Sequence, residues 1–258
     1  MPPLGVLALG DSITNGGGEL QWGVALQSWA LWAARGLGLP YSPFATDGAT
    51  VRDVVGGQLP ALERRSARPE AHYDLACLYV GVNDVRALDW SVDAFERDLD
   101  AAHGALAARA QRRLAVTIPL DLGRPRAGPK VEEANAAIER VAAHHAALVL
   151  DLRGMRGRRV LMADHVHPTA FGQLAIAERA LDVLAADGME VLERPWELVR
   201  YETTRVGRLR GDATYAYRHA KRSARAAGNR LGARLRQPRR RPLGTPGLSA
   251  RTRRPGRS

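Results

Sequence analysis

The stretch "LGVLALGDSIT" (residues 4–14) begins as an apolar run and ends in a polar turn. The run over residues 4–10 predicts a β-strand, and Ser12 follows that strand directly. A serine in this place can cap a following helix. It can also act as a nucleophile, provided that a base, an acid that orients the base, and oxyanion donors lie nearby. The rest of the chain decides between these two roles.

Apolar runs bounded by turn residues alternate with helical patterns along the chain. The expected strands cover residues 4–10, 41–46, 74–81, 113–119 and 147–152. The expected helices cover residues 20–38, a broken stretch over 50–65, and residues 91–110, 128–145 and 168–186. The third strand is apolar throughout, which is typical of a strand buried on both faces. The alternation predicts a three-layer α/β/α sandwich around a five-stranded parallel sheet, the flavodoxin-like arrangement.

Sites in such sheets lie outside the carboxyl ends of the strands. Three polar segments follow predicted strands: "GDSIT" after the first, "GVND" (81–84) after the third, and "ADHVHP" (163–168) after the fifth. Their positions in the chain predict that they meet at one edge of the sheet.

The three segments contain the residue types that nucleophilic catalysis needs. His167 can take the proton of Ser12, and Asp164, three residues before the histidine, can hold the other ring N–H. The side-chain amide of Asn83 can donate to a developing oxyanion, as can the backbone N–H groups of Ser12 and Gly48. Each motif alone is weak, since a turn after a strand often contains such residues.

Taken together, the motifs resemble those of the SGNH (GDSL-type) serine ester hydrolase family. They are Gly10-Asp11-Ser12-Ile13, Gly48, Gly81-Val82-Asn83-Asp84 and Asp164-His165-Val166-His167-Pro168. The resemblance covers about residues 4–186. Its second block is the loosest, because Gly56 is an alternative to Gly48 there.

The resemblance implies the SGNH hydrolase fold and a role for each matched residue. Ser12 is then the nucleophile, His167 the base and Asp164 its orienting acid. Ser12, Gly48 and Asn83 form the oxyanion hole, and two further acids support the loops. These supporting residues are Asp11 and Asp84.

The implied reaction is the hydrolysis of carboxylic esters through an acyl-enzyme intermediate. The resemblance covers esterase, lipase and acetyl-ester hydrolase types, and it implies neither a metal nor an organic cofactor. The chain has no long insertion that could form a lid, which favours a small-molecule or carbohydrate-linked acyl ester as substrate.

Other interpretations of these motifs fit less well. Residue 14 is a threonine, so the Gly-x-Ser-x-Gly elbow of α/β-hydrolases is absent. The "NGGG" run (15–18) lacks the Gly-Lys-[Ser/Thr] of a phosphate-binding loop and is expected to form a loop at the edge of the pocket. Asp164, His165 and His167 could be read as metal ligands, but no further ligand with supporting spacing accompanies them.

The positive charge is concentrated at the C-terminal end. The whole chain carries a formal net charge of +11. Residues 200–258 hold 18 Lys and Arg against two acids, a net of +16, so the remainder carries −5. We therefore divide the chain into a hydrolase domain over residues 1–194 and an arginine-rich extension over residues 195–258, partly helical and then disordered.

Three interpretations of this extension stay open at this point: a solvated tail, weak electrostatic contact with an anionic membrane or another polyanion, and nucleic-acid binding. No recognisable nucleic-acid-binding fold is present, so no specific nucleic-acid partner is predicted. The alternative function is therefore a polyanion- or membrane-surface-binding protein with a secondary or inactive hydrolase body.

The expected location is the cytoplasm; electrostatic contact of the extension with an anionic membrane would add a peripheral position at the inner membrane surface. The first apolar run has no basic region before it and reads as a strand, not as a signal peptide. The single cysteine, Cys77, fits a reducing compartment.

Overall fold

Five parallel strands form the central sheet of the computed structural model, which describes residues 3–20, 24–65, 72–199 and 204–236, with side chains up to residue 225. The strands are β1 (Val6–Gly10), β2 (Tyr41–Pro43), β3 (Tyr73–Tyr79), β4 (Ala110–Val116) and β5 (Leu148–Leu150). Their order in the sheet is β2-β1-β3-β4-β5. Because β1 and β3 are neighbours, with Gly10 paired to Tyr79, the loops that leave these two strands start side by side.

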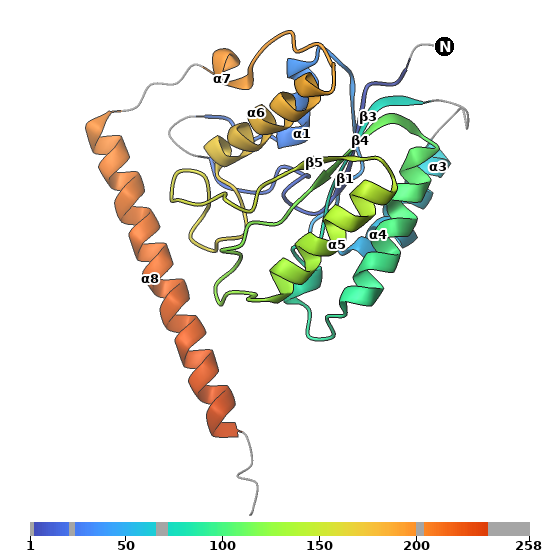
Figure 1. Cartoon of the computed structure of the whole chain (residues 1–258). Helices are drawn as coiled ribbons and strands as arrows, with labels where there is room; N and C mark the ends of the chain where they lie inside the picture. Colours follow the sequence, from blue (N-terminus) through green and yellow to red (C-terminus); the bar gives the residue numbers. More distant parts are fainter. Residues whose placement is uncertain (1–2, 21–23, 66–71, 200–203, 237–258) are drawn as a thin grey trace, which may run out of the picture.

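Helices cover both faces of the sheet (Figure 1). The helices are α1 (Trp29–Gly36), α2 (Val51–Asp53), α3 (Leu59–Arg65), α4 (Val92–Ala107), α5 (Lys130–His144), α6 (Ala170–Ala186), α7 (Pro195–Leu198) and α8 (Arg205–Arg236), with a π-helical turn η1 (Val54–Gln58) and a 3₁₀ turn η2 (Asp84–Arg86). Helices α1 and α6 pack together on one face, and α4 and α5 pack together on the other. The predicted three-layer α/β/α fold is thus confirmed.

The expected helix over residues 20–38 is wrong over residues 24–28, which form a loop, and α1 begins only at Trp29. Ser28 ends the preceding loop: its hydroxyl accepts a hydrogen bond from the Ala30 N–H and donates one to the Thr14 carbonyl. This N-cap fixes the start of the helix. Trp29 and Trp32 are buried in the core, and the third tryptophan of the pattern, Trp22, lies outside the described residues.

The second expected strand is shorter than the pattern indicated. It ends at Pro43, and the chain then runs on as a loop toward Gly48. The other strands and the helices α4, α5 and α6 agree with the predicted segments to within a few residues.

The described part of the arginine-rich extension contains the helices α7 and the long α8. Figure 1 shows α8 running alongside the loops between β5 and α6, outside the three layers. Residues 237–258, which the sequence predicts to be disordered, lie outside the described part. The division of the chain at residue 194 stays a prediction. Within the described segments, none of the helices combines the length and the apolar character needed to cross a bilayer.

Gln173, a buried residue of α6, ties three backbone groups together. Its side chain accepts a hydrogen bond from the Trp29 N–H and donates to the carbonyls of Ile13 and Gly17. Helix α6 is thereby joined to both ends of the loop that follows Ser12. No local sequence pattern could indicate this role, because Gln173 lies 144 or more residues from each partner.

Gln173→Leu should lower the free energy of unfolding by about 3 kcal/mol, because it leaves three backbone groups without their partner. Urea unfolding followed by circular dichroism measures the change. Gln111→Leu, at an exposed position on β4, is the matched control and should change stability little. Equal losses in the two variants would contradict the role of Gln173.

Candidate active site

Ser12, His167 and Asp164, which are far apart in the sequence, form a continuous hydrogen-bonded row at the carboxyl edge of the sheet. Ser12 Oγ lies 3.0 Å from His167 Nε2, and His167 Nδ1 lies 2.9 Å from Asp164 Oδ2. The other oxygen of Asp164 accepts hydrogen bonds from the backbone N–H groups of Val166 and His167. The short loop over 164–167 therefore holds both the acid and the imidazole in fixed positions.

Asp164 is an ionised carboxylate in this arrangement. Burial raises its pKa, but the hydrogen bonds from the His167 ring and from the two backbone N–H groups outweigh burial, so the pKa lies well below its usual range. A carboxylate next to the ring N–H orients an imidazole and stabilises its protonated form. The row can therefore move a proton from the Ser12 hydroxyl to His167.

Gly10 and Gln58 hold the strand end that carries Ser12. Gly10 has a φ of +140°, and a Cβ there would collide with the carbonyl oxygen of Tyr79 on β3. The Gln58 side chain accepts a hydrogen bond from the Gly10 N–H (2.9 Å) and donates one to the Gly10 carbonyl (2.7 Å). Gln58 comes from η1, whose "VVGGQ" sequence gave no indication of this contact.

The glycines after Ser12 close the loop back onto the serine. The Gly17 N–H donates a 2.6 Å hydrogen bond to the Ser12 carbonyl. A Cβ on Gly17 would lie 2.7 Å from that same oxygen, so a side chain does not fit. The "NGGG" run therefore forms a tight turn around the serine.

Two acids, one fully buried and one half-buried, hold loops beside the serine in place. Asp11 is fully buried and accepts a hydrogen bond from the Ile13 N–H, while its Oδ2 has no partner in the described part of the chain. Asp84 accepts a hydrogen bond from the Val51 N–H at the start of α2. Burial raises the pKa of Asp11 to about 7 and that of Asp84 to about 6.

Asn83 and Gly48 lie close together beside this edge. The Asn83 amide donates a 3.0 Å hydrogen bond to the carbonyl of Ala49, the residue after Gly48. Gly48 is exposed and has a φ of +76°, and among the described residues no atom lies within 4 Å of the place that a Cβ would take. Gly56, the alternative to Gly48, lies inside η1.

An open hollow of about 610 Å³ adjoins Gly48. Its polar lining comes from the loop after β2 and from α2 and η1, and includes Thr46, Asp47, Arg52, Asp53 and Gln58.

His165 does not join the row. Its φ is +55°, and its Nδ1 lies 3.0 Å from Asp121 Oδ2 and 2.8 Å from an Arg124 guanidinium nitrogen. Asp164 and His167 are bonded to each other. Of the three residues considered as metal ligands, His165 thus interacts with Asp121 and Arg124, and the other two interact with each other.

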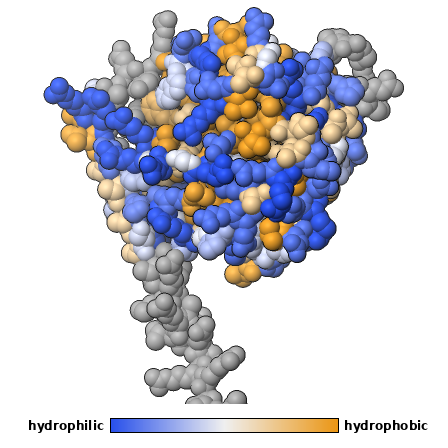
Figure 2. All heavy atoms as spheres, viewed as in Figure 1, coloured by the Kyte–Doolittle hydropathy of each residue, from blue (hydrophilic) through white to orange (hydrophobic). Residues whose placement is uncertain are grey.

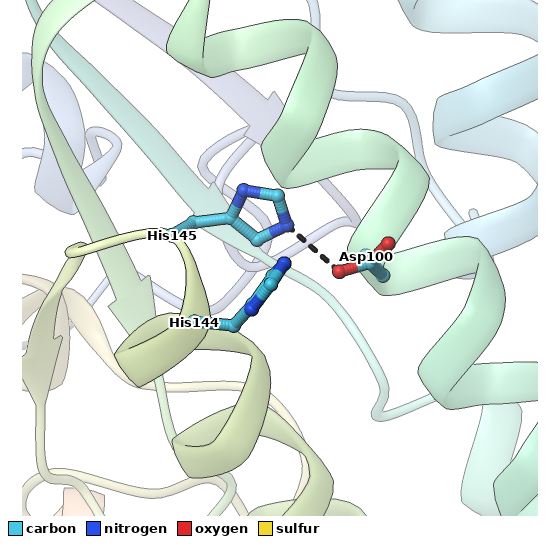
Figure 3. A group of neighbouring side chains, drawn as sticks. All are labelled: Asp100, His144 and His145. Carbon is cyan, nitrogen blue, oxygen red and sulfur yellow. Dashed lines mark hydrogen bonds and ion pairs between the residues drawn. The ribbon is translucent and has the colours of Figure 1, made fainter.

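A separate group of metal-type donors lies where α4 and α5 pack together, away from Ser12. Asp100, His144 and His145 each offer one donor atom, and these atoms lie within 4.8 Å of one another (Figure 3). His145 Nε2 is 2.8 Å from Asp100 Oδ1. The helix C-terminus also favours the partial positive charge of histidines. This group has no contact with the serine row.

Arg222 is a neighbour of the row that the sequence did not indicate. Its guanidinium, on α8, lies 3.1 Å from Asp164 Oδ2, the same oxygen that faces His167. The basic composition of the C-terminal segment was evident from the sequence, but 58 residues separate Arg222 from Asp164.

Comparisons with known proteins identify the family and the fold of the chain. The model of the GDSL-like Lipase/Acylhydrolase family matches residues 8–175. No curated protein matches the chain. Among solved structures, an α/β hydrolase from the metagenome of Lake Arreo, Spain, is 19% identical, with a TM-score of 0.56 over 70% of this chain and 94% of that one. The acetylxylan esterase Axe2 of Geobacillus stearothermophilus is 19% identical, with a TM-score of 0.55 over 72% of this chain and 94% of that one.

The buried Asp11 should make stability depend on pH. Its pKa rises from 3.8 in the unfolded chain to about 7 in the folded one, so the folded state holds a proton that the unfolded state has released. Raising the pH from about 4 to about 7 therefore destabilises the fold, by on the order of 4 kcal/mol at most. Asp11→Asn removes this contribution.

We expect the stability of Asp11→Asn relative to the natural chain to increase between pH ~4 and pH ~8, measured by urea unfolding at each pH. Asp89→Asn, at an exposed position, is the control and should show no such trend. A pH-independent difference for Asp11→Asn would contradict the prediction.

Proposed function

The chain belongs to the GDSL-like lipase/acylhydrolase family and is an ester hydrolase, and we propose that it cleaves carboxylic esters through Ser12, His167 and Asp164. The observation that carries this proposal is the hydrogen-bonded row in which Ser12 Oγ and His167 Nε2 are 3.0 Å apart. An N-cap serine would not need an imidazole at this distance.

In the proposed reaction Ser12 Oγ attacks the ester carbonyl while His167 Nε2 takes the hydroxyl proton. Asp164 holds the ring by its Nδ1–H and stabilises the imidazolium. The tetrahedral intermediate then expels the alcohol, which receives the proton from His167, and an acyl-enzyme remains. A water molecule, deprotonated by His167, then attacks the acyl carbon; the bond to Ser12 Oγ breaks, His167 returns the proton to Oγ, and the acid leaves.

We assign the oxyanion hole to the N–H groups of Ser12 and Gly48 and to the Asn83 amide. Neither backbone N–H donates to any residue that the structure describes, so both are available to a ligand. Asn83 uses one amide hydrogen for the Ala49 carbonyl, which fixes the side chain and leaves the second hydrogen for the oxyanion. Asp11 and Asp84 keep the loops that carry these donors in place.

For the substrate we propose a small acyl group, such as acetyl, on a polar or carbohydrate-linked alcohol. The hollow beside Gly48 is lined by carboxylate, guanidinium and amide groups that can hydrogen-bond to hydroxyls. The acetylxylan esterase of Geobacillus stearothermophilus, which shares the fold, points to the same substrate class.

Ser12→Ala should lower the kcat for short-chain p-nitrophenyl esters by about 10³-fold or more, because the nucleophile is lost. It should also abolish labelling by a fluorophosphonate probe. Ser42→Ala, on β2 and away from the row, is the matched control and should keep both activities. Turnover and labelling that survive Ser12→Ala would refute the mechanism.

Asn83→Ala should lower kcat by about 10²- to 10³-fold with a smaller effect on KM, because an oxyanion donor acts mainly in the transition state. Steady-state kinetics with p-nitrophenyl acetate measures both constants. A circular dichroism melt checks that the loop next to Ala49 stays folded. An effect confined to KM would show that Asn83 binds substrate in the ground state and does not stabilise the oxyanion.

A further inference from the structure

Ion pairs bind one face of helix α8 to the loops around the active site. Asp212 pairs with Arg158 at 2.9 Å, and Arg218 pairs with Glu19 at 2.5 Å. Arg222 lies 3.1 Å from the proposed catalytic acid Asp164.

Contacts between aromatic rings add to these ion pairs. The His219 ring lies 5.6 Å from the His165 ring and 6.0 Å from the Tyr215 ring. Residues 212, 215, 219 and 222 are spaced by three or four, so they lie along one face of the helix. All of these contacts are polar or aromatic, and aliphatic side chains take no part in them.

The other side of α8 carries an apolar stripe that faces away from the body. Val206 is 74% exposed, Leu209 69% and Tyr217 66%. Three exposed alanines continue the stripe at helical spacing: Ala213, Ala220 and Ala224. Figure 2 shows apolar side chains along the outer edge of this helix.

Basic side chains border the stripe. Helix α8 holds ten Lys and Arg residues and a single acid, Asp212. On a helical projection, Arg210, Lys221 and Arg225 flank one side of the stripe, and Arg205 flanks the other. An exposed apolar stripe between rows of cationic side chains is the pattern of a helix that lies in the interface of an anionic bilayer.

We propose that α8 is a membrane-surface helix that binds an anionic lipid bilayer through the stripe Val206–Leu209–Tyr217 and its basic flanks. The opposite face stays on the loops near Asp164. Nucleic acid is the less suitable partner, because phosphate binding needs the cations alone and leaves the apolar stripe without a role. Docking would hold the ester-hydrolysing body beside the lipid surface, a consequence that rests on the proposed function.

The test is flotation of the full-length chain with vesicles of phosphatidylcholine, with and without about one-third phosphatidylglycerol. We expect binding to the anionic vesicles, at least about tenfold weaker binding to the neutral ones, and weakening by added salt. Equal binding to both vesicle types, or none to either, would overturn the proposal.

A pair of charge-matched variants separates the stripe from net charge. Leu209→Ser/Tyr217→Ser should bind anionic vesicles at least about tenfold more weakly, since two apolar contacts are lost while the charge of the helix stays the same. Leu88→Ser/Leu192→Ser makes the same kind of change at exposed leucines of the body and should bind like the natural chain.

If both variants bind equally, or if a DNA duplex competes fully with the vesicles, binding rests on charge alone and the proposal is wrong. Hydrolysis of a soluble p-nitrophenyl ester should be unchanged in both variants. Ser12→Ala should bind vesicles like the natural chain. Ester hydrolysis and membrane binding are therefore tested independently of each other.

Discussion

The close approach of β1 and β3 at Gly10 sets the positions of the groups at the carboxyl edge. A side chain at Gly10 would collide with the Tyr79 carbonyl, so the two strands can run this close only with a glycine there. Gln58 then binds both the N–H and the carbonyl of Gly10, which makes the strand end rigid. Ser12 and Asn83 follow from these adjacent strands, so their separation depends on this contact.

Environment gives the aspartates at this edge different properties. Asp164 receives three hydrogen bonds and stays ionised, whereas burial raises the pKa of Asp11 and Asp84. The first can stabilise a positive charge on His167, and the other two hold backbone N–H groups. Identical side chains thus take an electrostatic or a structural role according to their solvation.

The sequence predicted those parts of the molecule that have a local signal. Continuous apolar runs indicated the strands, and the alternation with helices indicated the layers. The start of the expected helix over 20–38 was wrong because apolar spacing continues through the loop before Ser28, where a side-chain cap, and not periodicity, decides the start. The motifs around Ser12 and His167 follow predicted strands, but their roles came from the combined resemblance to a known family.

Contacts between segments far apart in the chain had no such signal. Gln58 and Gln173 are ordinary helix residues in sequence, and only the folded chain brings them to the backbone around Ser12. The basic character of α8 and its helical structure could be anticipated, but its contact with Asp164 could not, because a surface ion pair leaves no periodic pattern.

The position of Gln58 depends on the number of residues in the π-helical turn η1. In η1 the Leu59 N–H reaches the Val54 carbonyl, five residues back, so the turn holds one residue more than an α-helical turn. That extra residue sets the direction in which Gln58 points. Deleting one residue before it would tighten the turn and rotate Gln58 by about 100° away from Gly10. The segment between Gly48 and Gln58 should therefore tolerate substitutions better than insertions or deletions.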